Sequence, residues 1–315
     1  MMQITHINNN KKRGMGNLKK KLKKNWPFLV MLMIPLIFLL VFSYGPMYGV
    51  SIAFKRYSPG LGIWDSPWNQ FGHFERMMKD TLFIRALKNT LNISFLKLLI
   101  GFPAPIILAL ALNEIRFQKF KKIAQTISYL PYFLSWVIAA AMLIEILSPD
   151  RGLINSVLKM FGMNPVHFLA NKNTFIPVLI ISEIWKSIGY ESIIYLAAIT
   201  GVDLSIYEAA ELDGASRLQK MWHVTIPSIM PIILVMLILR LGQVLNAGFD
   251  QVLNLYNPSV YAVADIIDTY VYRIGLENFS FDYSTAVGLV KNLVGLVLIL
   301  TSNLIVKKTT GQNVI

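Results

Sequence analysis

The side chains best placed for chemistry lie in one charged stretch between two apolar runs, residues 203–231. Its acids come first and its bases last. On a short helix that order suits the macrodipole, which favours anions near the N-terminal end and cations near the C-terminal end. The stretch therefore predicts a charged, helical surface element, with these ionisable residues: Asp203, Glu208, Glu211, Asp213, Arg217, Lys220 and His223.

Local signals divide this stretch into two helices. Ser205 is followed three residues later by Glu208, the spacing of a capping box. Gly214 then interrupts the helical pattern, while Pro227 and Pro231 open the next apolar run, where proline loses no needed N–H. We expect a short helix, a break at Gly214, a second short helix and then a membrane span. An ordinary polar loop between two spans is the alternative.

Composition places the chain among membrane proteins. Of its 315 residues 55% are hydrophobic and only 15% charged, and the mean hydropathy is +0.52. A soluble domain usually carries about 25% charged residues. Cysteine is absent, which excludes disulfides and thiolate metal sites. The net charge of +13 is concentrated in tails and loops beside apolar runs, which favours membrane topology over nucleic-acid binding.

Six apolar runs are long enough to cross a bilayer. The first follows a basic tail and lacks a small-residue cleavage site, so we interpret it as an uncleaved span rather than a signal peptide. We expect an all-α polytopic protein with spans over 26–50, 89–112 (broken by Pro103 and Pro105), 127–147, 174–200, 226–248 and 285–306. The expected divisions are 1–25 as a basic tail, 26–84 as the first span with an outer loop, 85–308 as a five-span core, and 309–315 as a C-terminal tail.

The distribution of lysine and arginine predicts the orientation. With the N-terminus inside, the expected cytoplasmic segments carry sixteen basic residues. The expected outer loops, 48–84, 148–173 and 249–284, carry eight. Cytoplasmic segments are enriched in basic residues. Both termini and the charged stretch are therefore expected in the cytoplasm, and the basic tail could also contact anionic membrane lipid.

The charged stretch also resembles a family motif. Glu208-Ala209-Ala210, Asp213-Gly214-Ala215, nine residues up to His223, and Val224-Thr225-Ile226-Pro227 are similar to the EAA loop of the permeases of ABC importers. Val224 and Ile226 replace the family's usual Ile and Leu. The similarity extends over about residues 85–307, including Asn89-Thr90-Leu91 and Gly152-Leu153-Ile154-Asn155.

This resemblance implies a type I ABC-importer permease of the sugar and oligosaccharide branch, in the bacterial plasma membrane. It implies a second permease subunit (a heterodimer), two cytoplasmic ATPase subunits, an extracellular solute-binding protein and a sugar substrate. The EAA loop would be the coupling helix that docks on an ATPase. The residues expected to couple are Glu208, Ala209, Ala210, Asp213, Gly214, Ala215, Arg217 and Pro227.

No motif for catalysis is visible. The chain has no Walker-type phosphate loop, so ATP and Mg are expected on the partner ATPases and no cofactor on this chain. It lacks His-Glu-x-x-His, and its four histidines are scattered, so a zinc site is not expected. The alternatives from other classes are a secondary transporter or channel without an ATPase partner, for which no internal repeat is seen, and an intramembrane enzyme.

Polar groups inside spans are costly and tend to face water or one another. Arg240, in the middle of the fifth predicted span, is expected to face the interior. The charged residues in or near the ends of the predicted spans are Lys97, Glu145, Glu183, Lys186, Glu191, Arg240 and Lys291. Sugar sites combine aromatic stacking with hydrogen bonds to hydroxyls. The candidates for a substrate path are Trp185, Tyr190, Tyr195, Arg240, Gln243, Asn246 and Asn292, although each could instead serve contacts between helices.

Overall fold

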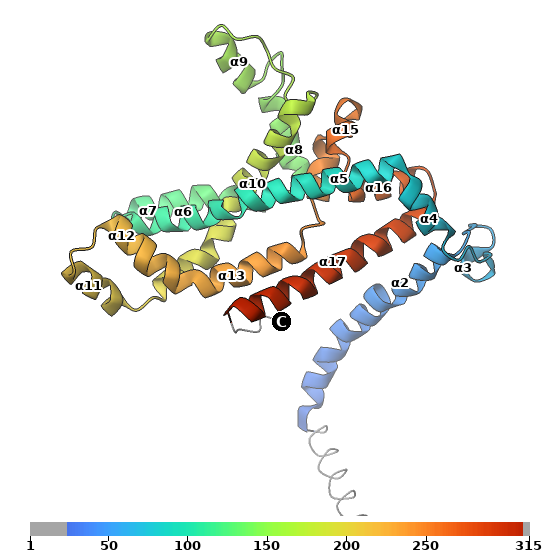
Figure 1. The fold of residues 1–315 in the computed structure, drawn as a ribbon, viewed down its shortest axis with the longest axis horizontal. Helices are drawn as coiled ribbons and strands as arrows, with labels where there is room; N and C mark the ends of the chain where they lie inside the picture. The colour runs from blue at the N-terminus through green and yellow to red at the C-terminus, as the bar shows by residue number, and fades with distance from the viewer. Residues whose placement is uncertain (1–23, 311–315) are drawn as a thin grey trace, which may run out of the picture. The chain divides into compact units, whose positions relative to one another are not determined.

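A computed structural model describes residues 24–310, which are almost entirely helical (Figure 1). The basic tail before Lys24 and the end of the expected C-terminal tail lie outside the described residues. Within the described part, four helices are long and apolar enough to cross a membrane, or six when each of two bent pairs is counted as one span. The expected all-α polytopic architecture is confirmed.

The chain divides into two compact units, and the first ends at Trp68. This unit holds a continuous helix, Lys24–Phe54, which contains the expected first span. The helix includes the π-helical turn η1 (Leu40–Tyr44), α2 (Gly45–Met47) and the 3₁₀ segment η2 (Tyr48–Phe54), and α3 (Gly62–Asp65) follows. After the helix, the Lys55 ammonium donates to the carbonyl oxygens of Ile63 and Trp64 at 2.8 and 2.9 Å. The lysine therefore holds the turn that closes the unit.

The second unit begins with α4 (Gly72–Lys79) and the next span. That span is one helix, Thr81–Glu114, made of α5 (Thr81–Leu96), the π-helical turn η3 (Lys97–Gly101) and α6 (Pro103–Glu114). The expectation that prolines break it is wrong. Pro103 lies in the first turn after the π-turn, where the missing N–H is tolerated.

Asp80 caps the start of this span by accepting from the backbone N–H of Leu82. Burial alone would raise the pKa of the Asp80 carboxyl. The hydrogen bonds from the Tyr270 hydroxyl, the Leu82 and Phe83 backbone N–H groups and the Tyr283 hydroxyl outweigh burial and hold that pKa below its usual value. The carboxylate therefore contributes stability at neutral pH, which is lost as pH falls through its folded-state pKa.

The expected span over 127–147 lies within a bent pair of helical segments. Residues Gln118–Phe133, which comprise α7 (Gln118–Tyr129) and the 3₁₀ turn η4 (Leu130–Phe133), meet α8 (Trp136–Ile146) at 105°. Leu134 is extended, and Ser135 caps α8 by accepting from the Ile138 backbone N–H. The basic segment 113–126, expected in the cytoplasm before this span, contributes most of α7. Beyond the span, α9 (Leu153–Met160) lies in the expected outer loop.

The fourth span and the charged stretch form the second bent pair. α10 (Lys172–Thr200) packs along α6 and meets α11 (Leu204–Leu212) at 71°. A turn then leads to α12 (Arg217–Lys220), the π-turn η5 (Met221–Thr225) and α13 (Ile226–Gly242), which together form one continuous helix. The expected first helix and the break at Gly214 are confirmed, but the second short helix is continuous with the fifth span, which ends at Gly242 rather than 248.

Residues 249–284, which were expected to form an outer loop, instead form short helices that supply much of the core. It contains α14 (Phe249–Leu255), η6 (Pro258–Val260), α15 (Tyr261–Ala264), α16 (Ile267–Tyr272) and the π-turn η7 (Arg273–Glu277). Val252, Val260 and Tyr270 are fully buried. Side chains of the second span satisfy its backbone: Asn89 donates to the Ala262 and Asp265 carbonyls, and Thr90 accepts from the Ile267 N–H.

The last helix, α17 (Phe281–Thr310), packs against α13, as Figure 1 shows, and it contains the expected sixth span. Its Lys291 pairs with Asp268 of α16.

A buried ion pair between Asp265 and Arg273, in the segment 249–284, gives a stability prediction. Asp265 is fully buried and accepts from the Arg273 guanidinium at 2.5 and 3.1 Å and from Thr269 at 2.9 Å. Asp265→Ala leaves a partly buried cation unpaired, so we expect a loss of about 3 kcal/mol in detergent unfolding. Arg151→Gln, in the exposed pair with Glu145, should leave the unfolding midpoint unchanged. Equal midpoints for the two variants would contradict the prediction.

Candidate functional site

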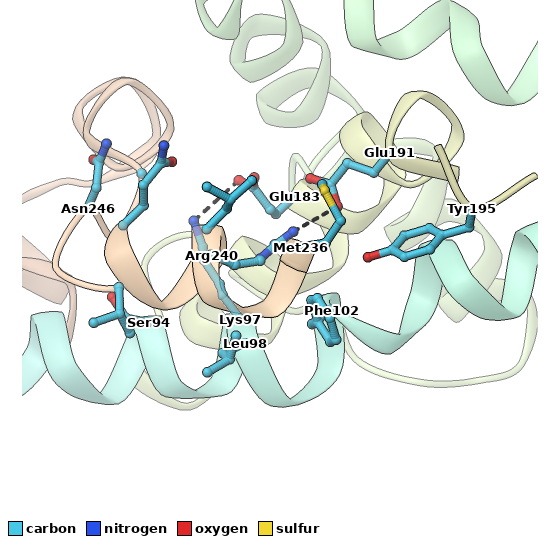
Figure 2. A pocket seen from close by; sticks show the side chains of 14 residues that line it. Ser94, Lys97, Leu98, Phe102, Glu183, Glu191, Tyr195, Met236, Arg240 and Asn246 are labelled. Atoms are coloured by element: carbon cyan, nitrogen blue, oxygen red, sulfur yellow. Dashed lines mark hydrogen bonds and ion pairs between the residues drawn. The ribbon is translucent and has the colours of Figure 1, made fainter. Parts of the chain in front are cut away.

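A cavity of about 410 Å³ lies where α5, η3, α10 and the end of α13 meet. Figure 2 shows charged side chains converging on it from three helices. Aromatic and apolar groups line the same space. The lining residues are Ser94, Lys97, Leu98, Phe102, Glu183, Glu191, Tyr195, Met236, Leu239, Arg240, Gln243, Val244, Asn246 and Gly248.

Lys97 is a fixed cation in this cavity. Its side chain is nearly buried, and its ammonium donates to Glu183 Oε2 at 3.3 Å, to the Ala247 carbonyl oxygen at 2.9 Å and to Gln251 Oε1 at 2.5 Å. Gln251 in turn donates to the Leu179 carbonyl and the Ser182 hydroxyl. The three donor positions of an ammonium are thus satisfied. Lys97 fastens the chain after α13 to the second and fourth spans.

Arg240 is the second cation of the cavity, and it is held less tightly. Its guanidinium donates to Glu191 Oε2 at 2.7 Å, and both side chains keep about a quarter of their surface exposed. An arginine carries five N–H donors in a planar fork. The pair therefore keeps donors free to meet a ligand in the cavity, whereas the ammonium of Lys97 has none left.

The structure brings four of the seven predicted path residues to this cavity: Tyr195, Arg240, Gln243 and Asn246. Arg240 faces the interior, as expected. Gln243 and Asn246 lie just beyond the end of α13 and are exposed. Trp185 and Tyr190 lie on α10 outside the cavity lining, and Asn292 is exposed on α17.

Sequence reasoning missed part of the site. Lys97, Glu183 and Glu191 stood out as costly charges in spans, and the same signal could have assigned them to a cavity. Gln251 carried no signal, because it falls in the segment expected to be an outer loop.

The charged stretch begins with a cap different from the one expected. Asp203, not Ser205, is the N-cap of α11, and its carboxylate accepts from the Ser205 backbone N–H at 2.9 Å. That hydrogen bond lowers the pKa of Asp203, so the cap is ionised at neutral pH. The capping box forms at the second helix instead, where Ser216 and Gln219 exchange backbone and side-chain bonds. Asp203 is favoured over Ser205 as the N-cap because a carboxylate near a helix N-terminus also interacts favourably with the helix dipole.

Gly214 makes the turn between the two helices. Its φ is +78°, a left-handed conformation that glycine adopts without a Cβ penalty. The Ala215 backbone N–H then donates to the Ala210 carbonyl at 2.9 Å, a bond of the kind that ends helices at glycine. No heavy atom of the described chain lies within 4 Å of a Cβ built on Gly214. The glycine is therefore required by backbone conformation rather than by crowding.

The expected coupling residues are displayed on this element. Ala210 and Ala215 are partly buried, and the others are exposed: Glu208, Ala209, Asp213, Gly214, Arg217 and Pro227. The Tyr207 hydroxyl hydrogen-bonds the buried Thr225 at 2.8 Å, which ties α11 to the turn that leads into α13. Arg217 Nη1 lies 3.9 Å from Oε2 of Glu114, the last residue of α6. Figure 1 shows α11 projecting at one end of this unit.

Gly248 gives a prediction for the cavity. Its φ is +92°, and an added Cβ would come within 2.6 Å of Lys97 Nζ. Gly248→Ala should therefore strain the backbone and displace the ammonium, at roughly 1–3 kcal/mol of stability in detergent unfolding. Gly288→Ala is the matched control, because its Cβ would meet nothing within 4 Å on α17. A Gly248→Ala variant as stable as the parent would show that the loop does not need this conformation.

Known proteins resemble this chain over a length that includes both the cavity and the charged stretch. A model of the family described as "Binding-protein-dependent transport system inner membrane component" matches residues 101–309. The polygalacturonan/rhamnogalacturonan transport system permease protein YteP of Bacillus subtilis (strain 168) is 47% identical over 282 residues, which cover 89% of this chain and 88% of the relative.

Solved structures of ABC transporters also resemble this chain. The chain matches the crystal structure of a bacterial ABC transporter that imports the acidic polysaccharide alginate, with a TM-score of 0.87 and 42% identity, covering 93% of this chain and 99% of the other. A crystal structure of a bacterial alginate ABC transporter in complex with an alginate pentasaccharide-bound periplasmic protein matches with a TM-score of 0.86, 41% identity and coverage of 93% and 98%. The chain belongs to the family of inner-membrane components of binding-protein-dependent transport systems, as a multi-pass transport subunit of an ABC importer.

Proposed function

We propose that this subunit imports an oligosaccharide that carries carboxylate groups, delivered by an external solute-binding protein. One observation carries the substrate class: relatives aligned along almost the whole chain are named for polygalacturonan/rhamnogalacturonan and for alginate. Both names denote glycans built wholly or partly from uronic acids. The cavity offers matching chemistry, since it combines an arginine, amides and aromatic rings.

Arg240 is the proposed carboxylate-binding residue of the cavity. It is held by one carboxylate, whereas Lys97 is held by three acceptors. A substrate carboxylate can take up the free donors of the guanidinium fork or replace Glu191 on it. The exposed amides of Gln243 and Asn246 border the same space and suit sugar hydroxyls, and Tyr195 supplies an aromatic wall.

The element from α11 to the start of α13 is the proposed dock for a cytoplasmic ATPase subunit, with ATP and Mg held by that partner. It exposes a set of large apolar side chains next to its charges, which is unusual for a polar loop. These are Leu204, Ile206, Leu212, Leu218 and Trp222. This assignment places both chain termini in the cytoplasm, in agreement with the excess of basic residues in the segments on that side.

α13 is the proposed transmission element. Its first residues follow η5, whose Thr225 is hydrogen-bonded to the Tyr207 hydroxyl of α11. Arg240 lies near the other end of α13. Because α12, η5 and α13 form one helix, a displacement of α11 that the Tyr207–Thr225 bond passes on would also move Arg240. Glu208 and Gly214 would set the docking surface and the turn.

The remaining wall of the path is assigned to a second permease subunit, in a heterodimer with two ATPase subunits. The exposed apolar faces of the other spans then contact membrane lipid.

The coupling role is tested at Gly214. Gly214→Pro and Gly214→Val should reduce uptake by the assembled importer about tenfold while ATP hydrolysis continues, because neither residue adopts the left-handed turn. Gly214→Asn is the matched control, since asparagine tolerates this conformation and should keep most of the uptake. Membrane insertion should be unchanged in all three variants. Normal transport by Gly214→Pro would contradict the docking role.

The substrate assignment is tested at Arg240. Arg240→Gln should lower uptake of an oligogalacturonate by about tenfold, because a charge-assisted hydrogen bond is lost. Glu191→Gln, which leaves the guanidinium in place, should keep more uptake than Arg240→Gln. Arg151→Gln, in an exposed ion pair away from the cavity, should behave as the parent. Equal uptake by Arg240→Gln and Arg151→Gln would remove Arg240 from the path.

A further inference from the structure

A group of aromatic side chains lies at the bend between α7 and α8, against α10. The rings of Tyr132 and Tyr190 are stacked, with centroids 3.8 Å apart and planes within 6°. Phe133 meets both rings edge-on. All three side chains are exposed, and Phe133 keeps 74% of its surface. We call Tyr132, Phe133 and Tyr190 the aromatic platform.

A lysine stands against this platform. The Lys186 ammonium lies 5.2 Å from the Tyr132 ring centroid and 5.5 Å from that of Trp136, and it donates to the Tyr132 carbonyl oxygen at 2.8 Å. No carboxylate in the described part of the chain lies within ion-pair distance of it. Lys97, Arg240 and Lys291 differ from it, because each of these three cations pairs with an acid. A cation without a carboxylate inside a span is costly unless it meets water or a ligand.

The platform adjoins the cavity along α10. Lys186 and Tyr190 are four residues apart and share one face, while Glu183 lies three residues before Lys186. Glu183 and Glu191 line the cavity, so the polar face of α10 continues from the cavity to the platform. The 105° bend between η4 and α8 lies beside this face, because Tyr132 of η4 stacks on Tyr190 of α10.

We propose that Lys186 and the aromatic platform form a subsite for one charged sugar unit of the transported oligosaccharide, beside the cavity that holds Arg240. The ammonium donates to the uronate carboxylate, and the apolar face of the sugar ring lies on an exposed aromatic ring. This inference rests on the proposed function and makes Lys186 a specificity-determining residue for acidic glycans.

Lys186 also supports the bend through the Tyr132 carbonyl, so the test must separate charge from structure. Lys186→Gln retains an N–H donor for that carbonyl and removes the charge, while Lys186→Arg retains both. Lys172→Gln is the matched control, because it makes the same substitution at an exposed position in the first turn of the same helix. Tyr190→Phe keeps a ring for stacking, and Tyr190→Leu removes it.

The experiment measures initial uptake of an oligogalacturonate by vesicles that contain the complete importer with its binding protein, alongside the unfolding midpoint of each variant. We expect Lys186→Gln to lower uptake about tenfold without a lower midpoint, and Lys186→Arg to restore most of it. Tyr190→Leu should lower uptake more than Tyr190→Phe, and Lys172→Gln should match the parent.

The possible failures are distinguishable. If the parent importer takes up no oligogalacturonate or other uronate oligosaccharide, the proposed substrate class and the subsite are both overturned. If the parent imports it and Lys186→Gln does so equally well, the subsite alone is overturned. A fall in uptake that follows a lowered midpoint in both Lys186 variants would assign the lysine to the bend and likewise overturn the subsite.

Discussion

The structure depends on the compensation of charges placed inside a membrane-spanning bundle. An unpaired charge at this depth costs several kcal/mol, so each one must be paired or must face a polar space. Lys97 meets this demand with Glu183, Gln251 and a backbone carbonyl. Its partners come from α10 and from the chain after α13, so that one ammonium fixes the relative positions of three segments. Lys97 and Glu183 line the cavity, so this compensation lies at its wall.

Irregular helix turns make this arrangement possible. The π-turn η3 contains Lys97, and the π-turn η5 precedes α13. Such turns occur where a helix accommodates a functional or packing demand. Beside η3, Pro103 starts a new helical segment without breaking the span, and beside η5 the Tyr207–Thr225 hydrogen bond joins α11 to the next helix. The proposed docking element and Arg240 of the cavity are therefore linked through one continuous helix, Arg217–Gly242.

Much of this fold could be predicted from sequence because hydrophobic run length and the positions of charges are local properties. The turn at Gly214 was predictable for the same reason. The choice of Asp203 over Ser205 as the cap depended on which residue the chain positioned before the first helical turn. The burial of 249–284 was not predictable, because its polar residues resemble a loop until partners such as Asn89 and Thr90 on α5 satisfy its backbone. The bend at η4 likewise needed the neighbouring α10, against which Tyr132 stacks.

The contrast among the charged residues of α10 and its neighbours then explains how one bundle can serve both stability and selectivity. A cation surrounded by protein acceptors, such as Lys97, has no donor left for a ligand, so its role is structural. A guanidinium held by one carboxylate retains donors, and the ammonium of Lys186 is held by a carbonyl and ring faces with no carboxylate of the described chain in direct contact. The latter two can interact with an anion that passes along α10, at a cost to the resting state that the aromatic faces and the carbonyl reduce. The proposed selectivity for acidic sugars thus rests on cations that are incompletely paired, while Lys97, whose three donor positions are used, ties α10 to the chain after α13.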